Sequence, residues 1–195
     1  MVKIFQYFRL IPFILAGIIV AAGCDPKPEI RTYKAPREEV EQVLVSAMLW
    51  CEDIPERPWW WFFTIRGDGE QVKKVMDDFK KWVATVHNFK DRKNLPEWQL
   101  PAGWTQEAPR TQLQRAIIKT GPNQDSPEIV VSDFGGDLLI NINRWRGQFD
   151  LPAATKDNLS DNYQMIPTRT GEEAYLVQVT GTSFQRGAGE PVPAK

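Results

Sequence analysis

Two neighbouring segments of the chain, VSAMLWCEDI and RPWWWFFTIRG, are rich in aromatic and β-branched residues. The turn-like PERP separates them, which predicts a β-hairpin. Because side chains alternate between the faces of a strand, Trp61 and Phe63 share one face, and Trp60 and Phe62 share the other. Large apolar groups on both faces predict a strand that is buried on both sides or that exposes an adhesive surface.

The pattern then changes from a period of two to the period of a helix. In GDGEQVKKVMDDFKKWVATVHNF, lysines and aspartates occupy one face, and apolar residues recur at i, i+3, i+4 and i+7. These apolar residues are Val72, Val75, Met76, Phe79, Trp82, Val83 and Val86. The spacing predicts a helix that packs on a sheet. The GDG at its start is interpreted as a turn with a helix cap, because it lacks the spacing of a phosphate-binding loop.

Residues 91–109 form a connector rich in proline, glycine and tryptophan, in which Trp98 and Trp104 are expected to be anchors. Residues 111–121 and 126–135 alternate like two antiparallel strands around the turn GPNQD. The pattern therefore adds two strands to the predicted hairpin and helix.

The segment GGDLLININRWRGQF is predicted to be a second helix. Leu138, Ile142, Trp145 and Phe149 follow one another at helical steps, and Asp137 is a good N-cap residue. The alternation ININ keeps a strand as the alternative.

A polar loop, LPAATKDNLSDNY, leads to a last predicted strand at 172–181. The elements predict one α+β domain at 44–182, with a mainly antiparallel sheet and two or more helices. An α/β/α sandwich is one arrangement of these layers. Residues 183–195 are expected to be a disordered tail.

The N-terminus predicts export. Lys3 and Arg9 precede the apolar run LIPFILAGIIVAAG, which is too short to span a membrane and suits a secretory signal at 1–23. The following AAGC resembles the bacterial lipobox, in which the cysteine, here Cys24, becomes acylated. Leucine is more common where Ala21 stands. A plain signal peptide and an uncleaved anchor are the alternatives.

A lipidated Cys24, carrying palmitate or similar chains, would hold the protein on the periplasmic side of a bacterial membrane without spanning it. Asp25 favours the inner membrane in some enterobacterial lipoproteins, but the choice between inner and outer membrane stays open. Cys24 and the proline- and charge-rich residues up to 43 are interpreted as an anchored flexible tether. EEVEQVLVSA could add a short helical turn, so the position where the tether ends and the domain begins is not sharply defined by the sequence.

Charge argues against a nucleic-acid partner. The whole chain has a net charge of −1, and without Lys3 and Arg9 it has 22 basic against 25 acidic side chains. Cys51, the only cysteine besides Cys24, lies in the apolar run MLWC and is expected to be buried rather than reactive.

Several segments resemble a family of planctomycete-type secreted or lipid-anchored proteins. They are WWFFTIRGDGEQVKKVMDDFKKWV, PEWQLPAGW, GGDLLININRWRGQFDLP and EEAYLVQVTG, in that order over about 45–182. The NRWRGQ signature is the most specific match, and Asp150 departs from the glycine expected before Leu-Pro. The family implies no particular activity. The element order is also similar, at the level of the fold alone, to PsbP/Mog1-type α/β/α sandwiches.

Common catalytic and metal-binding sets are missing from the sequence, so no cofactor and no metal are expected. His87 is the only histidine and is interpreted as a surface or helix-capping residue. Together with one available cysteine it cannot complete a zinc site. No G-x-S-x-G motif and no D-x-D-x-D-G loop occurs. Carboxylates from distant positions, forming a calcium site or an acid/base pair, remain open alternatives.

Eight tryptophans are a high number for 195 residues. Trp60, Trp98 and Trp104 are candidates for aromatic contacts with a sugar or peptide, although packing is the favoured interpretation.

Within NRWRGQ, helical geometry separates Arg144 from Arg146, and Trp145 is expected to point into the core. Asn141, Arg144 and Gln148 share one side and form the candidate binding face. The favoured interpretation is structural: the arginines tie the helix to neighbouring loops, and Gly147 supplies a left-handed stop.

The sequence as a whole favours a membrane-anchored extracytoplasmic lipoprotein that acts as a non-catalytic binding or interaction module. Its expected partners are the membrane, through the lipid, and an envelope protein or polymer. A carboxylate-dependent hydrolase acting on an envelope polymer is one alternative. An assembly factor for an envelope complex, which would use the WWWFF strand for contact, is another.

Overall fold

A long antiparallel hairpin lies at the centre of the structure. The computed structural model describes residues 40–52 and 57–182. In this part of the chain, strands β1 (Gln42–Cys51) and β2 (Trp59–Asp68) pair over their full length, from Gln42 opposite Asp68 to Cys51 opposite Trp59. The hairpin predicted from the aromatic pattern is therefore confirmed.

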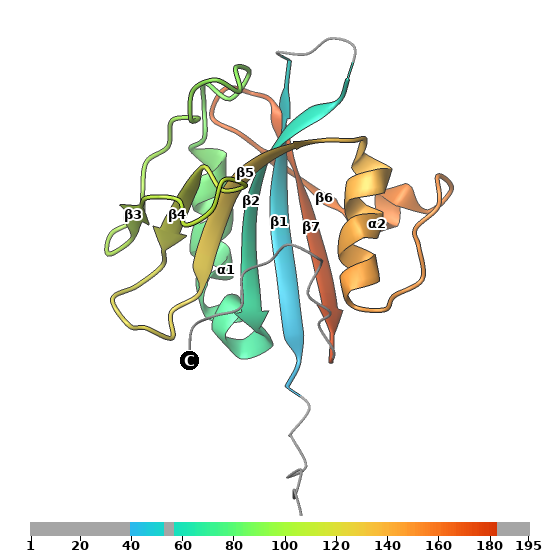
Figure 1. The fold of residues 1–195 in the computed structure, drawn as a ribbon, viewed down its shortest axis with the longest axis horizontal. Helices are drawn as coiled ribbons and strands as arrows, with labels where there is room; N and C mark the ends of the chain where they lie inside the picture. Colours follow the sequence, from blue (N-terminus) through green and yellow to red (C-terminus); the bar gives the residue numbers. More distant parts are fainter. Residues whose placement is uncertain (1–39, 53–56, 183–195) are drawn as a thin grey trace, which may run out of the picture. The chain divides into compact units, whose positions relative to one another are not determined.

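The other elements build outward from this hairpin (Figure 1). The sheet has seven strands in the order β3-β4-β5-β2-β1-β7-β6, and every neighbouring pair is antiparallel. The remaining elements are α1 (Gly69–Ala84), β3 (Thr105–Glu107), β4 (Ala116–Lys119), β5 (Glu128–Gly135), α2 (Leu138–Gln148), a 3-10 turn (Leu159–Asn162), β6 (Gln164–Pro167) and β7 (Glu173–Gly181). The predicted α+β class is confirmed.

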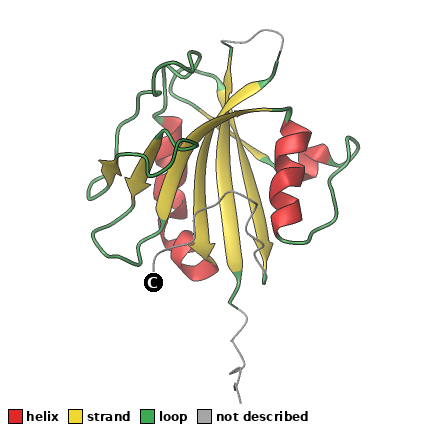
Figure 2. Cartoon of the chain, viewed as in Figure 1, coloured by secondary structure: helices red, strands yellow, loops and turns green. Residues whose placement is uncertain are grey.

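The two helices lie on opposite faces of the sheet, which makes three layers (Figure 2). One core contains the odd-numbered residues of the hairpin, such as Trp61 and Phe63, and packs against α1. The other contains even-numbered residues, such as Trp60 and Phe62, and packs against α2. The central strand is thus buried on both sides, which was one of the two outcomes expected from its pattern.

Helix α1 begins and packs as its sequence predicts. The side chain of Asp68 caps it by accepting hydrogen bonds from the backbone N–H groups of Glu70 and Gln71, at 3.0 and 3.2 Å. The helix cap expected at GDG is confirmed, but the expected turn is wrong: Gly67 and Asp68 are the last residues of β2, and α1 begins directly at Gly69. Phe79 and Trp82 are among the side chains that α1 buries against the sheet.

Helix α2 has the N-cap that was predicted and a different stop. The side chain of Asp137 accepts from the N–H of Ile140 at 2.7 Å, so a helix replaces the alternative of a strand. Gly147 lies inside the helix, and it is Asp150 that adopts the left-handed conformation, with φ of 54°. The N–H of Leu151 then closes on the carbonyl of Arg146 at 3.0 Å. The left-handed residue that ends α2 was expected at Gly147, and this was wrong, because it is Asp150, three residues later.

The structure adds two short strands and moves one boundary. Strands β3 and β6 extend the two edges of the sheet and were not predicted. Strand β1 starts at Gln42, so the domain begins two residues before the expected Leu44. The helical turn expected in EEVEQVLVSA is wrong from Gln42 onward, because these residues form strand. The signal, Cys24, most of the tether and the tail at 183–195 lie outside the described residues.

Candidate binding groove on the α2 face

Helix α2 covers only part of its face of the sheet. It packs over β1 and β7, where its core neighbours include Leu44 and Val177, and it lies beside β7 in Figure 1. The part formed by β2 and β5 is left without a helix and forms the floor of an open groove of about 930 Å³. A groove of this size lies within the range of small-ligand sites.

The groove has a mixed floor and two different walls. Phe62, Thr64, Val130 and Ser132 belong to the floor, which β2 and β5 supply. One wall comes from α2, and the other comes from the loops around 111–114 and 124–128. The lining of the groove therefore combines hydroxyl and amide groups with apolar side chains.

Arg144 is the main charged group on the α2 wall. Its guanidinium carbon lies 5.4 Å from the centre of the Phe62 ring and 5.3 Å from that of Phe134. It makes no hydrogen bond or ion pair with any residue in the described part of the chain. Partial burial desolvates the guanidinium and lowers the pKa of Arg144. The positive charge of Arg66 lowers this pKa further. The groove thus places Arg144 near a second arginine, and Arg144 has no carboxylate partner among the described residues.

Gln148 lies one helical turn after Arg144 on the same wall. Its Oε1 atom is buried, and it has no hydrogen-bond partner among the described residues. A buried acceptor without a donor is costly in a folded protein. Arg144 and Gln148 together give the groove a positive donor and an unsatisfied acceptor on one helix face.

Asn141, the third member of the predicted binding face, has a structural role. It is buried, and its Nδ2 donates to the carbonyls of Gly136 and Asp137 at 3.2 and 2.9 Å. It fixes the turn that enters α2, where Gly136 has φ of 107°. Two of the three predicted face residues therefore line the groove, and Asn141 does not.

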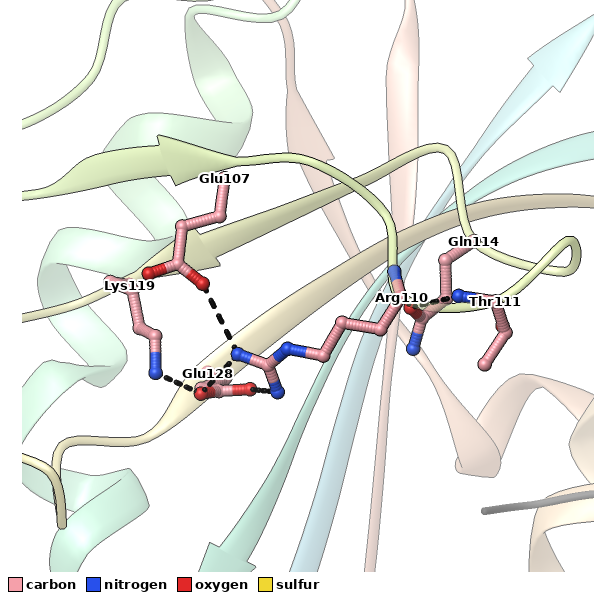
Figure 3. A network of polar contacts seen from close by, with 6 residues as sticks. All are labelled: Glu107, Arg110, Thr111, Gln114, Lys119 and Glu128. Atoms are coloured by element: carbon pink, nitrogen blue, oxygen red, sulfur yellow. Dashed lines mark hydrogen bonds and ion pairs between the residues drawn. The ribbon is translucent and has the colours of Figure 1, made fainter.

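The outer wall of the groove is held by a network of charges (Figure 3). Arg110 donates to both carboxylate oxygens of Glu128, at 2.8 and 3.0 Å, and also pairs with Glu107 at 3.2 Å. Lys119 pairs with the same carboxylate of Glu128. Gln114 accepts from the backbone N–H groups of Arg110 and Thr111, as Figure 3 shows. This network holds the 110–114 loop against β5 at the edge of the groove.

The other side of the NRWRGQ signature faces away from the groove. Asn143 exchanges two hydrogen bonds with the backbone of Ala154, at 3.0 and 2.6 Å. Arg146 donates to the carbonyl of Pro152 at 2.6 Å and to the side chain of Asn162 at 2.8 Å. The structural interpretation is therefore confirmed for Arg146, which ties α2 to the loop after it. Trp145 points into the core, as expected.

The three candidate tryptophans pack into the protein. Trp60 and Trp104 are buried, and Trp60 donates its Nε1–H to the carbonyl of Gly136 at 2.8 Å. Trp98 is half-buried and packs against Trp82 and Phe63 with centroid distances of 5.6 and 6.0 Å. Burial leaves Trp60 and Trp104 without an open face for a ligand. The packing interpretation fits all three positions.

Groups suited to catalysis are engaged elsewhere. Asp68 caps α1, and the pKa of Glu128 is held below its usual value, first by the hydrogen bonds from Arg110. In the described ranges 40–52 and 57–182, no three His, Cys, Asp or Glu side chains are grouped to hold a metal ion. His87 lies just beyond α1, with Nε2 at 3.3 Å from Glu97. Cys51 is buried and donates from its sulfur to the carbonyl of Lys90 at 3.0 Å, as expected for a packed thiol.

Arg66 is a groove residue that the sequence analysis missed. It follows Phe62 and Thr64 by steps of two along β2, so period-two alternation already places it on their face. The loops of the outer wall carry no such signal, because their approach to α2 depends on the tertiary fold.

The protein is thus a three-layer α+β domain with a polar, arginine-containing groove over the uncovered part of one face. No described helix is long and apolar enough to cross a membrane. No protein-family model, curated protein or solved structure matches the chain. The resemblances to the planctomycete-type family and to PsbP/Mog1-type folds therefore stay predictions.

Proposed function

We propose that the protein is a lipid-anchored, extracytoplasmic binding module of a bacterial envelope that holds its ligand in the groove on the α2 face. The observation that supports this most is Arg144. Its guanidinium has no carboxylate partner within residues 40–52 and 57–182, and it lies on the same wall as the unsatisfied Oε1 of Gln148, which suits a site that is completed by a ligand. A surface with no role in binding would be expected to pair these groups internally.

The anchor is supported by the sequence AAGC at 21–24 and is tested at Cys24. Wild type and Cys24→Ser would be expressed in a bacterium fed radiolabelled palmitate and then fractionated. Wild type should be labelled and sediment with membranes. The serine variant should be unlabelled and leave the membrane fraction once its signal is cleaved. Membrane retention of the cleaved serine variant would contradict the anchor.

The groove is tested by photo-crosslinking in intact cells. A photoreactive amino acid would replace Leu113, an exposed residue of the groove wall, or Lys73, an exposed residue of α1 on the opposite face. Adducts should form from position 113 and not from position 73. Equal adducts from both positions, or adducts from 73 alone, would contradict a ligand site in the groove.

Two other functions are less well supported by the structure. For a hydrolase, one carboxyl group usually needs a raised pKa to act as the acid, and Glu128 in the groove has a lowered one. For an assembly factor, the WWWFF strand would have to reach a partner, and Trp60, Trp61, Phe62 and Phe63 are buried.

A further inference from the structure

The charges around the groove favour a ligand with few negative charges. Arg66 and Arg144 both line it, and the acidic side chains nearby are partly committed. Asp68 caps α1 and Glu128 is held by Arg110 and Lys119, which leaves Asp125 as the only other acid lining the described groove. A densely charged polyanion would meet these three carboxylates. A single carboxylate can take the bidentate geometry that a guanidinium prefers.

The neutral polar groups of the groove resemble the groups of a peptide backbone. Five glutamines line it: Gln42, Gln71, Gln114, Gln124 and Gln148. A primary amide has N–H donors and a carbonyl acceptor, so it can pair with both the C=O and the N–H of a peptide bond. The oxygen of Gln114 is already occupied by the backbone N–H groups of Arg110 and Thr111, so this argument applies to the other four. The buried Oε1 of Gln148 in particular needs an N–H donor. The ligand that suits these groups has amides close to its carboxylate.

The aromatic rings of the groove argue against a sugar. Sugar sites commonly offer an open ring face for stacking. Here Phe62, Trp145 and Phe149 are only 1, 2 and 4% exposed, and the guanidinium of Arg144 lies over the ring of Phe134. The apolar part of the groove includes the exposed side chain of Leu113, which suits contact with an aliphatic side chain.

We infer that the groove binds an acidic peptide segment, with a carboxylate of the peptide on the guanidinium of Arg144 and the peptide backbone against the glutamine amides that line the groove. The inference rests on the proposed function, because it specifies the ligand of that same groove. It names a class of partner: an envelope protein that presents an Asp or Glu in an accessible stretch of chain.

The first test is a selection with random heptapeptides displayed on phage, against the full chain purified in detergent. Selected peptides should be enriched in Asp and Glu over the starting library. Recovery of no binders, or of binders with no excess of acidic residues, would overturn the inference.

The second test measures the affinity of the strongest selected peptide, made synthetically, for wild type and for variants by calorimetric titration. Arg144→Gln should weaken binding roughly tenfold to a hundredfold, which is the usual size of a hydrogen bond to a charged group. Lys73→Gln removes one positive charge from the far face and should leave the affinity within about twofold of wild type. Equal weakening by both would show only a general charge effect and would overturn the site.

Gln148→Glu tests the role of Arg144 in a second way, without replacing Arg144 itself. It places a carboxylate one helical turn from Arg144, where the two can form an ion pair within α2. This internal carboxylate should compete with the peptide and reduce its affinity at least tenfold, while the melting temperature stays at or above that of wild type. An unchanged affinity would overturn the role assigned to Arg144.

A sugar ligand would give a different result. Oligogalacturonate, a polymer of acidic sugars, would be titrated in parallel and should not bind. If oligogalacturonate binds to wild type and not to Gln148→Glu, and no peptide binds, the ligand is not a peptide. The groove would then still be the binding site. Absence of crosslinks from position 113 would instead overturn the proposed function itself, so the two failures can be told apart.

Discussion

The two faces of the sheet are built from the same strands and differ in how completely they are covered. On one face, the 16 residues of α1 and the connector after it bury a dense aromatic cluster in which Trp82 contacts Phe63, Phe79, Trp98 and Trp104. On the other face, the 11 residues of α2 cover β1 and β7 and leave the groove over β2 and β5. The first face is a closed aromatic core, and the second leaves an exposed guanidinium, that of Arg144, at the edge of an open groove.

The largest effect is expected on the closed face. Trp82→Ala should lower the free energy of unfolding by about 3–5 kcal/mol, because it opens a cavity in the centre of the aromatic cluster. Urea denaturation measures the loss. Trp50→Ala is the matched control, because Trp50 is 40% exposed, and it should cost less than half as much. Similar losses for the two variants would contradict the close packing of Trp82 in the α1-side core.

The next largest loss of stability is expected on the side of α2 that faces away from the groove. Asn143→Ala should cost about 1–3 kcal/mol, because it leaves the buried N–H of Ala154 without its acceptor. Binding in the groove should not change, since Asn143 faces the loop after α2. Asn123→Ala, at an exposed turn, should cost less than about 0.5 kcal/mol. Loss of binding by a stable Asn143→Ala protein would show that both sides of α2 contribute to the site.

A pH-dependent effect is expected at the outer wall of the groove. The pKa of Glu128 is lowered, first by hydrogen bonds from Arg110, so its stabilisation is present above the unfolded-state pKa and disappears as the pH falls through the folded-state pKa. Glu128→Gln should therefore cost about 1 kcal/mol at pH 7. The cost should vanish in acid, below the folded-state pKa. Urea denaturation at a series of pH values below 7 measures it, and a cost that does not fall as the pH is lowered would contradict the role of the ion pairs.

The smallest effect on stability is expected at Arg144. Arg144→Gln loses the interaction of one exposed guanidinium with its aromatic neighbours, worth about 0.5–1 kcal/mol in total, and it also relieves repulsion with Arg66. The net change in the free energy of unfolding should be below about 1 kcal/mol. A loss as large as that of Trp82→Ala would make Arg144 a structural residue rather than part of a binding site.

These differences also explain what the sequence can and cannot predict. The hairpin, α1 and α2 have clear periods of two or of helical spacing, and they were predicted. Strand β3 is the exposed tripeptide TQE, and β6 is the short QMIP, so neither has enough alternating positions to indicate a strand. Their pairing with β4 and β7 is set by the tertiary fold.

The candidate site was predicted only in part for a similar reason. Helical spacing alone places Arg144 and Gln148 on one wall. The same spacing also includes Asn141, but a turn at Gly136 buries its side chain against backbone carbonyls. The opposite wall comes from loops whose position no local pattern encodes. Asp150 shows a local constraint of another kind: it takes the left-handed conformation, which is most favourable for glycine.

The central claim, that ligand binds on the uncovered half of the α2 face, is tested most directly by NMR. The isotope-labelled full chain in detergent would be titrated with the strongest acidic peptide from the selection. We expect the largest amide shifts at Thr64, Arg66 and Ser132 on the floor and at Arg144 and Gln148 on α2, with no shifts along the exposed face of α1. Shifts centred on α1, or at the exposed aromatic residue Trp50, would contradict the claim.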